Sequence, residues 1–203
     1  QAIYQHIPNV IAQRFIYSHV NADIPIRDLK PALQSLIYAG LVYPLYQTAA
    51  SGLPFNATMN AKKFKLLFLD IGLCKYSSEL DAQIYTENDL VLLDKGTLAE
   101  QFVGQELLAY KENYRQSSLY YWEREKAGSS AEVDFVINVG SKIYPLEVKS
   151  GKTGRLKSLQ VFMNEKNLKY GVRISQHPLG LDKNILSVPL YMISQLPRII
   201  QEL

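Results

Sequence analysis

The sequence predicts an α/β protein with a mixed central sheet and flanking helices, preceded by a smaller module. The first observation is helical spacing of apolar residues after Gly96, and the second is a run of three strand-forming segments separated by turn residues. The third is a further amphipathic helix followed by another strand. In order, these segments are a helix over 97–114, strands over 119–125, 132–139 and 143–149, a helix over 156–163 and a strand over 170–174. Helix, three strands, helix and strand build one α/β layer, to which the tail 185–203 adds one more strand or helix.

Residues 1–90 are predicted to form a helical, winged-helix-like module, with a second domain over 91–203. Apolar residues recur at helical spacing in 1–20 and again from Leu33 to Leu41, where Gly40 is placed to end the helix. A short strand follows from Val42. A helix that ends before such a strand resembles the reading helix and wing of a winged helix, but the same pattern is common in ordinary packing. Both interpretations stay open.

Composition excludes several classes of protein. The chain has 203 residues, 47% of them hydrophobic, so it can bury a real core. Its net charge of +3 is too small to indicate a nucleic-acid partner by itself. The single cysteine, Cys74, argues against a disulfide framework and a cysteine-rich zinc site, so we expect a reducing, cytoplasmic compartment. No run of about 18 apolar residues predicts a membrane span.

The consecutive strands carry charged residues that could converge. Asp134 is a charge among strand formers and is predicted to share a face with Glu132 and Val136, opposite Val133 and Phe135.

On the next strand, Glu147 and Lys149 share one face and lie about 6.6 Å apart along the strand. If the strands are neighbours, Asp134 and Glu147 meet at one point, which favours a hard cation such as Mg²⁺ or Mn²⁺ between them. The ammonium of Lys149 would stabilise charge on a phosphoryl oxygen. The alternative is that Glu147 and Lys149 form a solvent-exposed ion pair, across strands or on one face, and that Asp134 lies at a strand edge to discourage aggregation.

Basic residues gather after the last of these strands. Residues 140–173 hold eight Lys or Arg against two Glu, and the segment 150–157 places glycines and cations where a strand meets a helix. A solvated helix face is the alternative. Aromatic residues at 120–122 could stack on bases, although aromatic strands are more often core. The candidates for nucleic-acid contact are Lys152, Arg155, Lys157, Trp122 and Arg124.

Four motifs together resemble a known family. They are Gly96-x-x-x-Glu100-x-x-Val103, Tyr121-Trp122-x-Arg124, Glu132-Val-Asp-Phe and Leu146-Glu-Val-Lys-Ser-Gly-Lys. This set resembles the C-terminal domain of unknown function that follows an AAA-type ATPase domain in many bacterial and archaeal proteins, which is similar to the PD-(D/E)xK nuclease superfamily. The resemblance is close over 96–174 and looser in 31–73. It implies a restriction-endonuclease-like fold.

The resemblance also implies residue roles. Asp134 and Glu147 would be metal ligands for Mg²⁺ or Mn²⁺, Lys149 the catalytic lysine, and Glu100 the helix carboxylate that completes the metal site. Glu106 lies nearer the centre of the apolar stripe of the helix, and the two carboxylates cannot both point inward. We assign the role to Glu100 because its spacing from Gly96 fits the family better.

Three functions follow as hypotheses. The first is a metal-dependent nuclease-like domain acting on DNA. The second is a catalytically silent nuclease fold that docks DNA or protein for an attached ATPase, and the third is an oligomerisation domain. The chain begins at Gln1 and lacks a GxxxxGK[ST] phosphate loop, so we expect a piece of a longer protein whose ATPase domain lies elsewhere.

Overall fold

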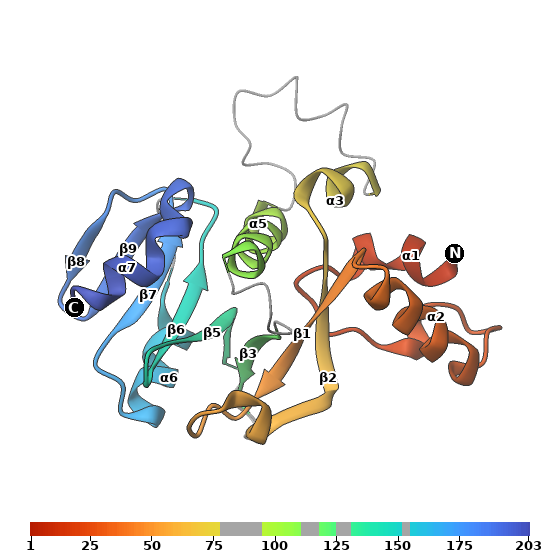
Figure 1. Cartoon of the computed structure of the whole chain (residues 1–203), viewed down its shortest axis with the longest axis horizontal. Helices are drawn as coiled ribbons and strands as arrows, with labels where there is room; N and C mark the ends of the chain where they lie inside the picture. The colour runs from red at the N-terminus through yellow and green to blue at the C-terminus, as the bar shows by residue number, and fades with distance from the viewer. Residues whose placement is uncertain (78–94, 111–117, 125–130, 152–154) are drawn as a thin grey trace.

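A computed structural model describes residues 1–77, 95–110, 118–124, 131–151 and 155–203 (Figure 1). Several expected features therefore lie outside the described residues: the loosely assigned segment before Lys95, the end of the helix expected up to Tyr114, and the turn at 127–130. The described helices are α1 (Ala2–His6), α2 (Ile26–Tyr38), α3 (Ile71–Ser77), α5 (Lys95–Ala109), α6 (Lys157–Lys166) and α7 (Leu196–Gln201), with 3-10 turns at Ile7–Val10, Tyr17–His19, Phe55–Thr58 and Leu190–Gln195. The described strands are β1 (Val42–Thr48), β2 (Met59–Phe68), β3 (Leu119–Glu123), β4 (Glu132–Val133), β5 (Phe135–Val139), β6 (Lys142–Val148), β7 (Gly171–Ser175), β8 (Gly180–Asp182) and β9 (Ile185–Pro189).

These strands form two mixed sheets that meet at one residue. The first sheet has the order β2-β1-β3-β4 and the second β5-β6-β7-β9-β8. β4 and β5 follow one another with only Asp134 between them, so the same stretch of chain is the last strand of one sheet and the first of the other. β4 runs antiparallel to β3, and β5 runs antiparallel to β6. The predicted mixed α/β class is therefore confirmed, in the form of two linked sheets.

From α5 onward the order of elements is the expected one of helix, strands, helix and strand. One detail of the strands differs from the sequence prediction. Val133 was expected to share a face with Phe135, but it packs with Val136 in the core beside α6, whereas Phe135 packs against α5. The break at Asp134 interrupts the period of two, because a residue outside the ladder shifts every later side chain to the opposite face.

The N-terminal segment is less helical than expected. The helix predicted over residues 1–20 ends at His6 and continues only as a 3-10 turn containing Pro8. Proline has no N–H for a helical bond to the residue four places earlier, which accounts for the tightened turn.

The helix and strand expected of a winged-helix-like module are connected to a larger sheet. The expected helix and strand are present as α2 and β1, and Gly40 adopts a left-handed φ of +69° between them. However, β1 pairs antiparallel with β2 on one side and parallel with β3 on the other. The strand therefore belongs to the four-stranded sheet.

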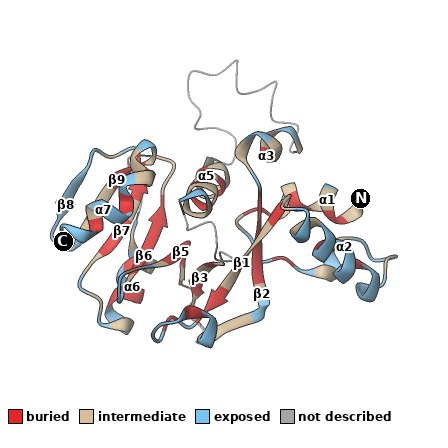
Figure 2. Cartoon of the chain, in the orientation of Figure 1, coloured by how far each residue is buried: buried red, intermediate tan, exposed pale blue. Residues whose placement is uncertain are grey.

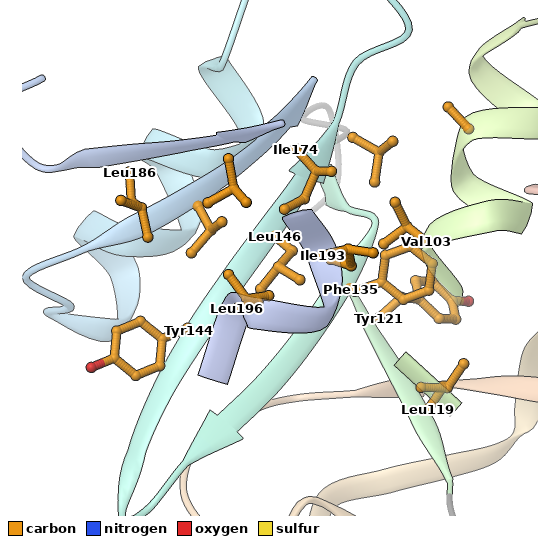
Figure 3. Close-up of a cluster of buried hydrophobic side chains, with 14 of the residues drawn as sticks. Val103, Leu119, Tyr121, Phe135, Tyr144, Leu146, Ile174, Leu186, Ile193 and Leu196 are labelled. Atoms are coloured by element: carbon orange, nitrogen blue, oxygen red, sulfur yellow. The ribbon is translucent and has the colours of Figure 1, made fainter. Parts of the chain in front are cut away.

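Helices cover the sheets and bury most of the strand residues (Figure 2). α5 and α7 pack against the cluster that includes Val103, Phe135, Leu146 and Leu196 (Figure 3). α6 covers a second cluster, in which the Trp122 and Phe162 rings meet edge to face. No helix within the described residues is long and apolar enough to cross a membrane.

The sheet crosses the domain boundary predicted near residue 90. Besides the pairing of β1 with β3, α5 is fastened to β2 by the side chain of Gln101, which is fully buried. Its Oε1 accepts a hydrogen bond from Phe68 N–H and its Nε2 donates to Phe68 O, both at 2.9 Å. Elements from both sides of the predicted boundary therefore share one sheet.

Replacing Gln101 with leucine should destabilise the protein. Gln101→Leu leaves a buried N–H and C=O of Phe68 unpaired, so we expect the free energy of unfolding to fall by about 2–4 kcal/mol. Chemical denaturation measures the loss. Gln160→Leu, an exposed position on α6, is the matched control and should change stability little. Equal stability of both variants would contradict the conclusion that the hydrogen bonds of Gln101 hold α5 against β2.

Candidate functional site

Asp134 occupies the point at which the two sheets meet. Its Oδ2 accepts a hydrogen bond of 2.7 Å from Val148 N–H, and only 9% of the residue is exposed. The main-chain ladder between β5 and β6 begins at the pair of Phe135 and Leu146, so the carboxylate takes a donor on β6 just beyond that pair. This bond holds Asp134 against the end of the strand that carries Glu147.

Glu147 and Lys149 lie at the end of β6, as the sequence predicts. The Lys149 ammonium donates to Glu147 Oε1 at 2.6 Å. Glu147 is 6% exposed and its Oε2 has no hydrogen-bond partner, although that atom is buried. The sequence alternative of a solvent-exposed ion pair is therefore incorrect in one respect, because the carboxylate of this pair is buried.

Glu100 is the helix carboxylate that faces these residues. It lies on α5, and the charges of Asp134 and Glu147 act on it. Glu106, the other candidate on this helix, accepts a hydrogen bond from the adjacent Gln105 at 3.3 Å. Glu100 is therefore close enough to Asp134 for the two carboxylates to repel each other, as expected for the helix carboxylate of the site.

Sequence reasoning missed Lys65, a buried cation in the same group. Lys65 lies on β2, its side chain is 1% exposed, and its ammonium donates to Glu132 Oε1. The ammonium also lies 5.0 Å from the centroid of the Tyr121 ring. The available signal was a lysine inside the apolar run 64–68, where each neighbour is a buried strand residue.

Together these side chains form what we call the charged cluster: Glu100, Glu132, Asp134, Glu147, Lys65 and Lys149. Burial, followed by repulsion from Asp134, raises the pKa of Glu100 to about 8, although Lys65 opposes the shift. Burial and Asp134 likewise raise the pKa of Glu147 to about 7. Burial also raises the pKa of Asp134, against the hydrogen bond from Val148. Loss of hydration is thus the main reason that these carboxyl groups resist ionisation, and repulsion between the carboxylates adds to it for Glu100 and Glu147.

The donor set of the charged cluster fits a hard divalent cation in its chemistry. Carboxylate oxygens are the ligands that Mg²⁺ and Mn²⁺ prefer, and the buried Glu147 Oε2 lacks a partner. Among the described residues, however, no three His, Cys, Asp or Glu side chains are gathered closely enough to hold a metal ion. Metal binding would therefore require the carboxylates to move closer together.

The predicted nucleic-acid contacts lie in different environments. Arg155 and Lys157 are exposed at the start of α6, whereas Lys152 lies outside the described residues. Trp122 is 4% exposed and packs edge to face on Phe162. Its ring is therefore not available to stack on a base. Arg124 forms an ion pair with Glu165 at 2.5 Å.

Two family models match separate parts of the chain. Residues 95–193 match a family described as a domain of unknown function (DUF4143), and residues 1–84 match another domain of unknown function (DUF8612). The interval between the matches contains the boundary that the sequence predicts near residue 90. In the charged cluster, Lys65 comes from the match over 1–84, and the carboxylates come from the match over 95–193.

Comparison with individual proteins adds little. No curated protein matches the chain. Among solved structures, protein VC1899 from Vibrio cholerae is 12% identical, with a TM-score of 0.30, and the match covers 99% of this chain and 50% of that one. The chain thus spans about half the length of VC1899, and so low a TM-score carries no argument about fold.

The raised carboxyl pKa values predict a pH dependence of stability. Between about pH 4.5 and 8, Glu100 holds its proton in the folded state and loses it in the unfolded state. The folded state then binds more protons, so the contribution of Glu100 to stability falls as pH rises through this window. Glu147 acts in the same direction up to about pH 7.

Chemical denaturation in EDTA across this window measures the effect. His6, whose pKa is lowered by burial and by His19, acts in the opposite direction, so the comparison with a variant carries the test. Glu100→Gln should lose less stability with rising pH than the wild type does, whereas Glu106→Gln on the same helix should follow the wild type. The prediction is wrong if Glu100→Gln and the wild type give parallel curves.

Proposed function

We propose that this chain carries a metal-dependent nuclease-like domain that acts on DNA phosphodiesters. A divalent cation, Mg²⁺ or Mn²⁺, would be its cofactor, and the full-length protein would include an ATPase domain. The charge balance of the charged cluster is the observation that carries this proposal. With every group ionised, four carboxylates face two ammoniums, which leaves a net charge of −2; Asp134 and Glu147 are buried, whereas the side chain of Glu132 is 42% exposed.

One divalent cation would neutralise that charge. Without it, protons are held instead, as the pKa values of about 8 for Glu100 and about 7 for Glu147 indicate. Exchange of a bound proton for a cation is the usual coupling between metal affinity and pH. A purely structural ion-pair network would be expected to balance its charges, because unpaired buried charge is costly.

Each residue has a role that its position supports. Asp134 and Glu147 would hold the cation, with Asp134 fixed by Val148 N–H and Glu147 directed by Lys149. Glu100 would complete the site from α5. When bound, the cation would polarise a phosphoryl oxygen and make a bound water more acidic. The Lys149 ammonium would stabilise the negative charge that develops on the phosphate.

The same end of β6 leads toward the basic residues that would hold DNA. Arg155 and Lys157 are exposed at the start of α6, and cations at a helix start bind phosphate without regard to sequence. Arg124 is held by its ion pair with Glu165, which lies near the other end of α6. DNA is therefore the partner that we propose, and the fold would be restriction-endonuclease-like.

A catalytically silent docking module for an attached ATPase is the second candidate. It is favoured by the absence, within the described parts of the chain, of carboxylates gathered closely enough to hold a metal. It is also favoured by the ion pair that engages Lys149. Under this hypothesis, Lys149 and Glu147 would stabilise the strand end, and the exposed cations would still bind DNA or an acidic protein surface.

Plasmid cleavage with Mg²⁺ or Mn²⁺ separates the two candidates. We expect the wild-type chain to cleave, and Lys149→Ala and Asp134→Ala to lose at least about 100-fold in rate, as is usual when a charge-stabilising group is removed. Lys142→Ala, an exposed lysine at the start of the same strand, should cleave normally.

The outcomes are distinct. Cleavage that survives Lys149→Ala and Asp134→Ala would contradict the proposed site. If no protein cleaves but the wild type binds DNA in a salt-sensitive way, the docking module is supported and the nuclease proposal is wrong. Loss of DNA binding as well would leave oligomerisation.

A further inference from the structure

Lys65 stands apart from the other members of the charged cluster. It comes from β2, in the part of the chain matched by a different family model, and reaches the carboxylates through the first sheet. β2 is separated from β4, which carries Glu132, by β1 and β3 in the sheet order. The Lys65 side chain therefore crosses the face of the sheet, over the Tyr121 ring, to reach its partner.

A lysine in this position is costly unless it is compensated. Transfer of an ammonium out of water carries a penalty of several kcal/mol, which only close anions offset. Burial lowers the pKa of Lys65, but the charges of Glu132, Glu100 and Asp134 outweigh burial and raise it overall. The ammonium therefore stays charged, with a 1% exposed side chain that cannot reach a ligand outside the cluster.

We propose that Lys65 is a positioning residue that serves as the internal counter-ion of the charged cluster. It holds Glu132 beside Asp134, keeps the carboxylates together in the absence of metal, and sets how much negative charge is left for a cation. This inference rests on the proposed function only for the identity of that cation. Because Lys65 lies in the segment 1–84 and the carboxylates lie in the segment 95–193, both matched segments contribute to the cluster.

Charge arithmetic gives the inference a quantitative form. With all groups ionised, the cluster carries −2, and removal of the Lys65 charge makes it −3. Removal of the Glu132 charge makes it −1, and removal of both returns it to −2. Because Coulombic attraction follows net charge, the affinity for a divalent cation should follow the same order. An ion pair too far from the carboxylates to act on a bound cation would show no such order.

The test is the Mg²⁺-induced rise in the thermal unfolding midpoint at about pH 9, above the pKa of about 8 for Glu100, compared with KCl at matched ionic strength. The variants are Lys65→Met, Glu132→Gln and the double variant, with Lys62→Met on the exposed part of β2 as the control. We expect Lys65→Met to bind Mg²⁺ about tenfold more tightly than the wild type, and Glu132→Gln about tenfold more weakly. The double variant and Lys62→Met should match the wild type.

The outcomes of this test separate the two proposals. If Mg²⁺ raises the unfolding midpoint of all the proteins equally, or of none of them, the proposed role of Lys65 is wrong. A response in Lys65→Met but not in the wild type supports the internal counter-ion and contradicts the metal requirement of the proposed function. If Lys65→Met does not fold, Glu132→Gln and the double variant are compared instead. The inference predicts a larger Mg²⁺-induced rise in the unfolding midpoint for the double variant than for Glu132→Gln. Equal rises would overturn it.

Discussion

Burial of more negative than positive charge is the constraint on which the candidate site depends. Asp134 and Glu147 are each at least nine-tenths buried, and the two ammoniums near them compensate only part of the charge of four carboxylates. A fold tolerates such an imbalance only by binding protons, by binding cations or by losing stability. The raised pKa values of Glu100 and Glu147 correspond to the binding of protons, and the proposed function rests on the binding of a cation.

The fold creates this constraint through one break in a strand. At Asp134 the chain leaves the first sheet and enters the second, and the side chain of this residue takes Val148 N–H as its donor. The same break reverses the face of Phe135, which then packs against α5 beside Gly104, where a Cβ would lie 2.4 Å from Leu67. Because Gly104 has no side chain, α5 packs closely against Leu67 and Phe135. The same close packing brings Glu100, one turn earlier on α5, toward Asp134.

Local patterns predicted much of this arrangement and missed what is not local. Helical spacing and period-two alternation were sufficient to order the elements from α5 to β7 and to select Asp134, Glu147 and Lys149. Family spacing was needed to choose Glu100 over Glu106. Lys65 was missed because its partner Glu132 lies 67 residues away, and the pairing of β1 with β3 leaves no signal in either strand. Trp122 was misassigned to an interface because an aromatic residue in a strand has the same pattern whether it faces a base or Phe162.

Anomalous X-ray diffraction from crystals soaked in Mn²⁺ would test the central claim, that the charged cluster can seat a divalent cation. The account predicts one strong anomalous peak, contacted by carboxylate oxygens of Asp134 and Glu147, with Glu147 Oε2 among its ligands. Bond lengths near 2.2 Å would be expected for a hard cation of this size, roughly as for Mg²⁺. Saturating Mn²⁺ with no peak at the cluster would contradict the account, and the charges would then be a structural network alone.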